Sequence, residues 1–269
     1  MDCVSELDAA VTGYRQIASE YYDPTAHPTC KNFRDASCLF LTKNLPEMQL
    51  IRTAVDVGAG SSLLAEVLST KSITLSRLVI LDRCLEMLQH SRAYLATGAL
   101  LLIADAKALP IDSSAADLVV ASLGDAFNVD SFWAEVARCL RRGGRCLFTT
   151  PSLEWAQAFR TLATNEKDDF AFFELRDGRG IYVPSIIHPI PVQLPIFLRH
   201  NLKPISVELI YKAQLPSPIS PNLQFDKTQE QPVVVEDPTD ASRKYRAACT
   251  SRLLDCLPEN LFWPTDLYR

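Results

Sequence analysis

The stretch that decides the fold is Ala54-Val55-Asp56-Val57-Gly58-Ala59-Gly60-Ser61-Ser62. An apolar run rich in β-branched residues ends in two glycines, and two serines then precede an apolar pattern with helical spacing at 63–68. This order predicts a buried strand, a tight turn and a helix that begins near Ser62. Such a unit opens many nucleotide-binding α/β domains, because the glycines let the backbone approach a ligand and the first helix amides point toward it.

The residues of this loop also favour one class of nucleotide. The dinucleotide fingerprint requires a third glycine, and Leu63 stands at that position. Asp56, two residues before the first glycine, would repel a pyrophosphate at close range. S-adenosylmethionine has no phosphate, and its ammonium and sulfonium groups are both positive. The loop is therefore better suited to S-adenosylmethionine.

Two later motifs extend this reading. Leu109-Pro110-Ile111-Asp112 precedes an almost unbroken apolar run from 117 to 122, and residues 135–144 follow a Glu-x-x-Arg-x-Leu-x-x-Gly-Gly pattern. With the glycine loop, these motifs make the sequence similar to the class I S-adenosylmethionine-dependent methyltransferases, in particular the type 11-like family. Ser62 and Ala116 depart from that family, which often has a glycine and an aromatic residue at these positions.

The resemblance covers residues 50–211 and is specific only for cofactor binding. It implies a set of cofactor-binding residues at the carboxyl edge of the sheet: Asp56, Gly58, Gly60, Asp82, Arg83, Asp105, Ala106, Ser122 and Leu123. Asp56, Gly58 and Gly60 would surround the methionine moiety. Asp82 would bind the ribose hydroxyls, and Arg83 would lie over the adenosine edge. Asp105 and Ala106 would contact the adenine, and Ser122 and Leu123 would lie beneath the sulfonium. Taken alone, Asp82 could equally be a helix N-cap.

The acceptor side is less well defined by the sequence. Asp125-Ala126-Phe127 is a faint echo of the Asp-Pro-Pro-Tyr motif of amine methyltransferases, and Asp125 is the carboxylate best placed to orient or deprotonate an acceptor. Tyr22, Ser185 and His188 are candidates for substrate contacts. Alternative roles stay open, because Tyr22 could belong to the core and His188 could be structural.

Composition sets the broad class. The chain has 269 residues, a formal net charge of -5 and 48% hydrophobic residues, which is enough for one large α/β domain and argues against a broad nucleic-acid surface. The eight cysteines contain no Cys-x-x-Cys pair, so we expect buried free thiols in a reducing cytoplasm and no metal centre. No apolar run is long enough to span a bilayer, and we expect a cytoplasmic protein.

The remaining elements follow from hydrophobic spacing. We expect N-terminal helices over 4–21 and 36–45, with His27 in a surface loop between them, and strands at 77–82, 99–104, 117–122 and 145–151. Further expected elements are helices over 83–96, 130–141, 152–164 and 192–201, a hairpin over 170–187 and a last strand at 205–211. Gly143-Gly144 should end the helix of 130–141, and Glu135 with Arg138 should tie that helix down. The expected fold is an α/β, Rossmann-like seven-stranded sheet with an antiparallel last strand.

These elements predict three regions. Residues 1–49 form a helical cap, residues 50–211 the methyltransferase core, and residues 212–269 a proline-rich C-terminal extension. The predicted function is methyl transfer from S-adenosylmethionine to a small molecule by in-line displacement. Two alternatives remain, namely N-methylation of a protein or nucleic-acid amine, and a non-catalytic binding subunit.

Overall fold

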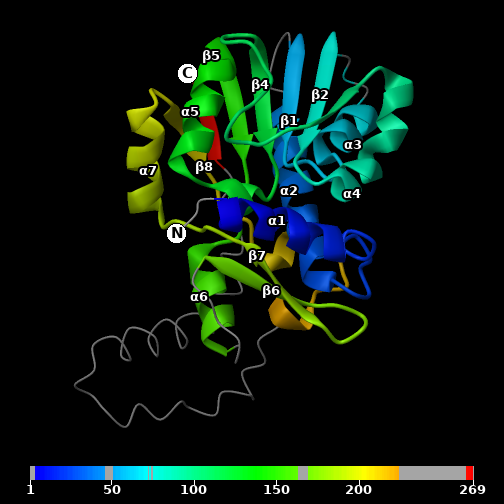
Figure 1. Cartoon of the computed structure of the whole chain (residues 1–269). Coiled ribbons are helices and arrows are strands. Elements are labelled where there is room, and N and C mark those ends of the chain that lie inside the picture. The colour runs from blue at the N-terminus through cyan, green and yellow to red at the C-terminus, as the bar shows by residue number, and fades with distance from the viewer. Residues whose placement is uncertain are drawn as a thin grey trace, which may run out of the picture.

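The computed structural model describes residues 4–45, 51–71, 73, 75–162, 169–223 and 265–268. Its centre is a sheet in the order β3-β2-β1-β4-β5-β9-β8 (Figure 1). The first five of these strands are parallel to one another: β1 (Thr53–Val57), β2 (Arg77–Asp82), β3 (Leu100–Ile103), β4 (Ala116–Ala121) and β5 (Leu140–Phe148). The edge strand β8 (Lys203–Val207) pairs antiparallel with β9 (Thr265–Tyr268), which pairs antiparallel with β5.

The described residues also form α-helices, several of which cover the two faces of the sheet. They are α1 (Val4–Ile17), α2 (Pro28–Asn44), α3 (Leu63–Thr70), α4 (Leu85–Leu88), α5 (Asp130–Cys139), α6 (Leu153–Leu162) and α7 (Ile190–Arg199). Short 3-10 helices span Gln89–Thr97, Gly124–Phe127, Lys212–Gln214 and Pro221–Leu223. The helix expected over 83–96 is therefore one α-helical turn followed by a longer 3-10 segment.

The alternation of side chains along the central strands builds two cores. Leu118 and Val120 of β4 point toward one face, where they pack with residues of α2 and α3. Val119 and Ala121 point to the other face and pack with α5 and α7, whose Trp133 and Phe197 are fully buried. Because both faces are covered, β4 is apolar from Leu118 to Ala121, as the sequence predicted, and its one charged residue, Asp117, lies near its start.

The predicted sheet was wrong in its last strands. The hairpin of β6 (Phe170–Glu174) and β7 (Gly180–Pro184) does not join the central sheet but forms a separate antiparallel pair. Only alternate residues of β7 are buried, which fits a hairpin covered on one face rather than a strand inside the sheet. The antiparallel strand next to β5 is the C-terminal β9, not residues 205–211, and a four-residue strand with two polar residues carries no sequence signal of its own.

Two local predictions also need correction. Gly143-Gly144 does not end α5, because the helix already stops at Cys139 and both glycines lie inside β5, where the register with β4 shifts. Gly143 has a φ of 80°, so it supplies the left-handed conformation at this irregularity. His27 is buried rather than in a surface loop, since α2 begins directly after it at Pro28.

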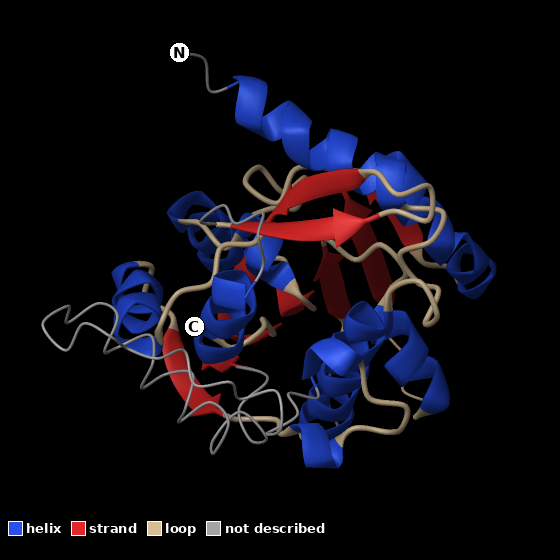
Figure 2. Ribbon diagram, turned by 90° about the horizontal axis from the view of Figure 1, so that it is seen from below, coloured by secondary structure: helices blue, strands red, loops and turns tan. Residues whose placement is uncertain are grey.

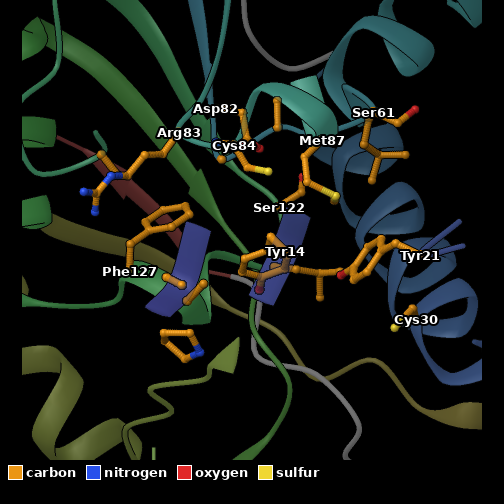
Figure 3. Close-up of a pocket in the computed structure, with 18 of the residues that line it drawn as sticks. Tyr14, Tyr21, Cys30, Ser61, Asp82, Arg83, Cys84, Met87, Ser122 and Phe127 are labelled. Carbon is orange, nitrogen blue, oxygen red and sulfur yellow. The ribbon is translucent and has the colours of Figure 1, made fainter. Parts of the chain in front are cut away.

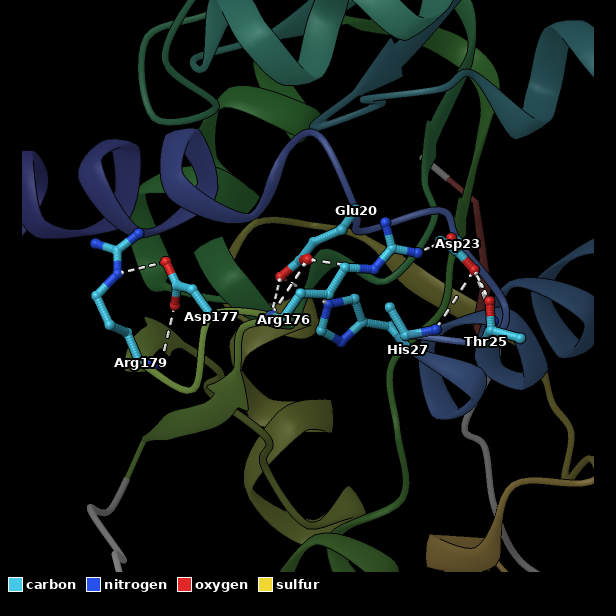
Figure 4. Close-up of polar contacts among 8 residues, drawn as sticks. Glu20, Asp23, Thr25, His27, Arg176, Asp177 and Arg179 are labelled. Carbon is cyan, nitrogen blue, oxygen red and sulfur yellow. Dashed lines mark hydrogen bonds and ion pairs between the residues drawn. The ribbon is translucent and has the colours of Figure 1, made fainter.

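The N-terminal segment and the hairpin pack together beside the central sheet. Figure 2 shows α1 running alongside the two strands of the hairpin, and β7 contacts α1. Polar contacts join the same parts, as Figure 4 shows. The Glu20 carboxylate accepts the backbone N–H of Arg176 at 3.2 Å, and the Arg176 guanidinium pairs with Asp23. These contacts fix the hairpin against the turn that follows α1.

Candidate active site

A large cavity lies at the point where the strand order reverses. β1 and β4 are neighbours in the sheet, although their crossover connections run to opposite sides, and ligands of open α/β sheets bind at such a switch point. The cavity has a volume of about 920 Å³, within the range of sites for drug-sized ligands. Its walls come from the loops after β1, β2, β3 and β4 and from the segment of α1 and α2 (Figure 3).

Seven of the nine predicted cofactor residues line this cavity: Gly58, Asp82, Arg83, Asp105, Ala106, Ser122 and Leu123. Asp56 and Gly60 are not among its described lining residues. The sequence therefore brings together the residues that end four separate strands, as expected when parallel strands place their carboxyl ends at one edge.

Two aromatic side chains lie against the glycine loop. Gly58 and Gly60 have φ angles of 62° and 48°, a region that favours glycine. A Cβ at Gly58 would collide with the Phe127 ring, and one at Gly60 would collide with the Tyr22 hydroxyl. That hydroxyl also accepts the Ser61 backbone N–H at 2.7 Å. Tyr22, predicted as a substrate contact, therefore holds the loop as well as lining the cavity.

Asp56 lies below the loop rather than in the cavity. Its carboxylate is 1% exposed and accepts a hydrogen bond from the Ser62 hydroxyl at 2.6 Å. The same hydroxyl accepts the backbone N–H of Ala65 and so caps α3, which confirms the predicted cap. Burial raises the pKa of Asp56 to about 7, against the opposing effect of the Ser62 hydrogen bond. The structure thus gives Asp56 a role in shaping the loop.

Asp82 faces the cavity at the end of β2. One of its oxygens accepts the Gly60 backbone N–H and the other accepts that of Cys84, each at 2.8 Å. Each carboxylate oxygen can accept a further hydrogen bond, so both hydroxyls of a ribose could still be bound. Burial raises the pKa of Asp82 to about 6, although both backbone hydrogen bonds lower it. Asp82 is therefore not the N-cap of α4, which is Cys84, although its carboxylate accepts the Cys84 amide and lines the cavity.

The next wall carries the predicted adenine-binding residues. Asp105 follows β3, and its carboxylate accepts the Lys107 backbone N–H at 2.9 Å. Arg83 lies 3.6 Å from the same carboxylate, measured between Nη1 and Oδ2. Ala106 is buried beside them. This wall thus combines a carboxylate and an apolar surface, which suits an adenine edge and ring.

Ser122 and Leu123 form the floor after β4. The Ser122 hydroxyl is buried and has no hydrogen-bond partner among the described residues, although it lines the cavity. Leu123 has a φ of 56°, which is uncommon for a side-chain-bearing residue and is held by the Thr149 hydroxyl on its backbone N–H. A polar atom left unsatisfied at a strained turn is typical of a ligand contact.

The acceptor-side candidates do not all gather at one place. Asp125 and Ser185 lie together, with the Ser185 hydroxyl donating to Asp125 Oδ2 at 2.8 Å. Both line a second cavity of about 260 Å³, which shares residues with the first. His188 lines neither cavity in the described part of the chain. The predicted substrate contact at His188 therefore has no support in the geometry.

Several residues of the site were not predicted from the sequence. Tyr14, Cys30 and Met87 line the large cavity, and Phe127 closes on the glycine loop. Tyr14 and Met87 fall at helical spacing, where an apolar or aromatic residue normally indicates core packing. No three histidine, cysteine, aspartate or glutamate side chains within the described residues gather closely enough to hold a metal ion.

Fold and cavity together define a Rossmann-like α/β protein with a cavity at the switch point of its sheet. Residues 55–148 match a family described as a methyltransferase domain, whose members use S-adenosylmethionine. The predicted resemblance to the class I S-adenosylmethionine-dependent methyltransferases is thus confirmed. No curated protein matches the sequence.

Solved structures share the fold at low sequence identity. One belongs to the complex between the Haloferax volcanii Trm112 methyltransferase activator and the putative methyltransferase (16% identity, TM-score 0.62, 95% of this chain and 96% of that chain). Another is an S-adenosylmethionine-dependent methyltransferase from Clostridium acetobutylicum (13% identity, TM-score 0.58, 95% of this chain and 98% of that chain). A third is geranyl diphosphate C-methyltransferase from Streptomyces coelicolor (14%, TM-score 0.53, 87% and 78%). None of the helices in the described residues has the length and hydrophobicity needed to cross a bilayer.

Proposed function

We propose that the protein is an S-adenosylmethionine-dependent methyltransferase that acts on a small-molecule acceptor. The observation that supports this most strongly is the cavity at the switch point, which gathers the ends of β1, β2, β3 and β4. Its position corresponds to the cofactor site that the family resemblance implies. The proposal keeps the division into a cap (1–49), a core (50–211) and an extension (212–269).

The residues present fit this cofactor. Asp82 offers free lone pairs for the ribose hydroxyls, and Asp105 with Ala106 offers a carboxylate and an apolar surface for the adenine. The unsatisfied Ser122 hydroxyl and the strained Leu123 lie at the floor, where the sulfonium would be placed. Gly58 would lie near the methionine moiety. Asp56 would act indirectly in this assignment, through the loop that it holds with Ser62.

The chain's own residues would contribute alignment and exclusion of water. When bound, S-adenosylmethionine supplies an electrophilic methyl group on a positively charged sulfur. Tyr14, Tyr21 and Tyr22 cover the cavity from the N-terminal segment and would shield the reacting atoms. Aligning two reactants in this way can contribute several kcal/mol to lowering a barrier, roughly 7–11 kcal/mol in the best cases.

The test combines transfer with binding. The full chain is incubated with methyl-labelled S-adenosylmethionine and a panel of small acceptors, and we expect a labelled product by mass spectrometry. Asp82→Asn should weaken S-adenosylhomocysteine binding about tenfold or more in calorimetry, because charge-assisted hydrogen bonds are worth about 1.5–3 kcal/mol. The matched variant Asp177→Asn changes an exposed carboxylate in the hairpin turn and should bind normally. Equal affinity of the Asp82 variant and the native chain would contradict the assignment.

A further inference from the structure

The second cavity is continuous in its walls with the first. The two share Tyr14, Tyr21, Cys30, Leu123 and Phe170, so a ligand in the smaller cavity would lie next to one in the larger. The labelled residues Tyr14, Tyr21 and Cys30 lie near one another in Figure 3, on the side of the N-terminal helices. A volume of about 260 Å³ exceeds the ~150 Å³ cavity that accommodates benzene. The smaller cavity is therefore large enough for a ring with a short substituent.

The described lining of the smaller cavity contains eight tyrosine, phenylalanine and tryptophan rings. The rings that line the cavity come from the N-terminal segment, α6 and the hairpin: Tyr14, Tyr21, Phe33, Trp155, Phe170, Phe172, Phe173 and Tyr182. The Tyr21 and Phe173 rings lie 6.1 Å apart between centroids, and Phe173 lies 5.7 Å from the ring of His27. Aromatic faces attract cations as well as apolar groups. This wall therefore suits an apolar body that carries a positive charge.

Leaving histidine aside, the acidic and basic side chains in the described lining of this cavity are of one sign. Its described lining contains the carboxylates of Asp125 and Glu174 and no lysine or arginine. Burial raises the pKa of Cys30 to about 12, and the Asp125 carboxylate adds to that increase. The Tyr14 pKa is also raised, first by burial and then by Asp125. The negative charge of Asp125 therefore raises the pKa values of two side chains that line both cavities.

Resting on the proposed function, we propose that this cavity is the acceptor site and that it binds a small aromatic or apolar primary or secondary amine. The ammonium group would lie at Asp125, whose carboxylate is held by the Ser185 hydroxyl and whose backbone C=O accepts the Ile186 N–H at 2.8 Å. The apolar body would lie among the aromatic rings. Asp125 thereby becomes a residue that selects the acceptor by its charge.

The corresponding reaction balances without a further reagent. The ammonium loses one proton to Asp125 or solvent, and the nitrogen lone pair forms the new N–C bond. The electron pair of the broken C–S bond stays on sulfur, which leaves S-adenosylhomocysteine and the N-methylated amine. A hydroxyl acceptor would instead need a base such as His27, whose Nε2 lies 3.5 Å from Glu20. A site for a hydroxyl acceptor would not prefer a cationic ligand, so a comparison of charged and neutral probes distinguishes the hydroxyl acceptor from the amine acceptor.

The test compares three probes of similar size on the full chain saturated with S-adenosylhomocysteine. Phenethylamine is a cation at neutral pH, 2-phenylethanol is neutral and phenylacetate is an anion. We expect calorimetry to show phenethylamine binding about tenfold more tightly than the alcohol, with phenylacetate weakest, because one charge-assisted hydrogen bond contributes on this scale. Equal or tighter binding of the alcohol or the anion would overturn the proposal.

Two variants locate the charge preference. Asp125→Asn should remove the preference for phenethylamine over 2-phenylethanol, and Ser185→Ala should reduce it if the first variant does not fold. Asp177→Asn, an exposed carboxylate outside both cavities, should leave it unchanged. An unchanged preference in folded Asp125→Asn would overturn the site. Failure to bind S-adenosylhomocysteine would count against the proposed function itself, whereas normal cofactor binding without amine preference would count only against this inference.

Discussion

Asp56 is a buried carboxylate that contacts the start of the neighbouring helix. It lies in β1, is 1% exposed and holds the Ser62 hydroxyl that caps α3. The raised pKa of about 7 means that the folded chain binds a proton at Asp56 more tightly than the unfolded chain does. Its contribution to stability is therefore largest below pH 4, where the carboxyl is protonated in both states, and declines as the pH rises to about 7.

The loss of stability with rising pH that follows from the raised pKa of Asp56 can be tested with Asp56→Asn. Between pH 5 and pH 8 the free energy of unfolding of the native chain should fall, relative to the variant, by about 2–4 kcal/mol. Urea unfolding at both pH values measures the difference. Asp112→Asn, at an exposed aspartate, provides the control and should show a much smaller change. A difference between native chain and Asp56→Asn that does not vary with pH would contradict the assigned cause.

At the scale of single residues, the sequence predicted where the site residues lie better than it predicted what their side chains contact. The carboxylates at the ends of β2 and β3 were identified because an acid after an apolar run marks a strand end, and Asp82 and Asp105 do line the cavity. The orientation of Asp56 was not predictable, since a residue inside a strand can point to either face of the sheet. Tyr22 and Phe127 reach the glycine loop from distant segments, and no local pattern encodes such contacts.

One buried amide side chain joins α5 to two neighbouring segments. Asn128 is fully buried, and its Oδ1 accepts the Trp133 indole N–H at 2.8 Å. Its Nδ2 donates to Gln193 of α7 at 2.8 Å and to the Ile186 carbonyl at 3.2 Å. One side chain thus links α5, α7 and the segment after β7.

Replacing this amide should be costly. Asn128→Leu keeps a similar volume but leaves the Trp133 N–H and two acceptors without their partner, so we expect a loss of about 3–5 kcal/mol in the free energy of unfolding. Asn222→Leu, at an exposed asparagine, should change stability by only about 0.5 kcal/mol. Urea denaturation measures both variants. A loss below about 1 kcal/mol at Asn128 would show that the network does not stabilise this junction.

Element prediction succeeded where the signal was local. The bounds of β2 and the cap of α3 agree with the sequence analysis, and Glu135 with Arg138 ties α5 to the preceding loop as predicted. Glu135 accepts the Leu109 N–H at 2.7 Å, and Arg138 donates to the carbonyls of Leu109 and Ile111. The order of the outer strands was wrong, because the pairing of β9 with β5 joins segments more than a hundred residues apart. The hydrophobic spacing of the sequence also predicts a helix over 243–257 and an apolar segment at 261–264, and both lie outside the described residues.

At the scale of the whole molecule, the cap and the hairpin enclose what the sheet leaves open. The parallel strands end at the large cavity, and the N-terminal tyrosines with the hairpin line its other side and the second cavity. Part of the extension also joins the fold, because Asn32 of α2 accepts the Ser220 N–H at 2.8 Å and donates to the Pro218 carbonyl. The core alone would leave the proposed acceptor cavity without Tyr14, Tyr21 and Phe33, three of the eight aromatic side chains in its described lining.

The most direct test of the account is a thermal unfolding experiment that compares S-adenosylhomocysteine with NAD+. A ligand at a hundred times its Kd stabilises the folded state by about 2.7 kcal/mol, which raises the Tm of a chain of this size by about 5–10 °C. We predict such a rise with S-adenosylhomocysteine and none with NAD+, because Leu63 occupies the position of the third glycine that a pyrophosphate-binding loop requires. A rise with NAD+, or no rise with S-adenosylhomocysteine, would contradict the assignment.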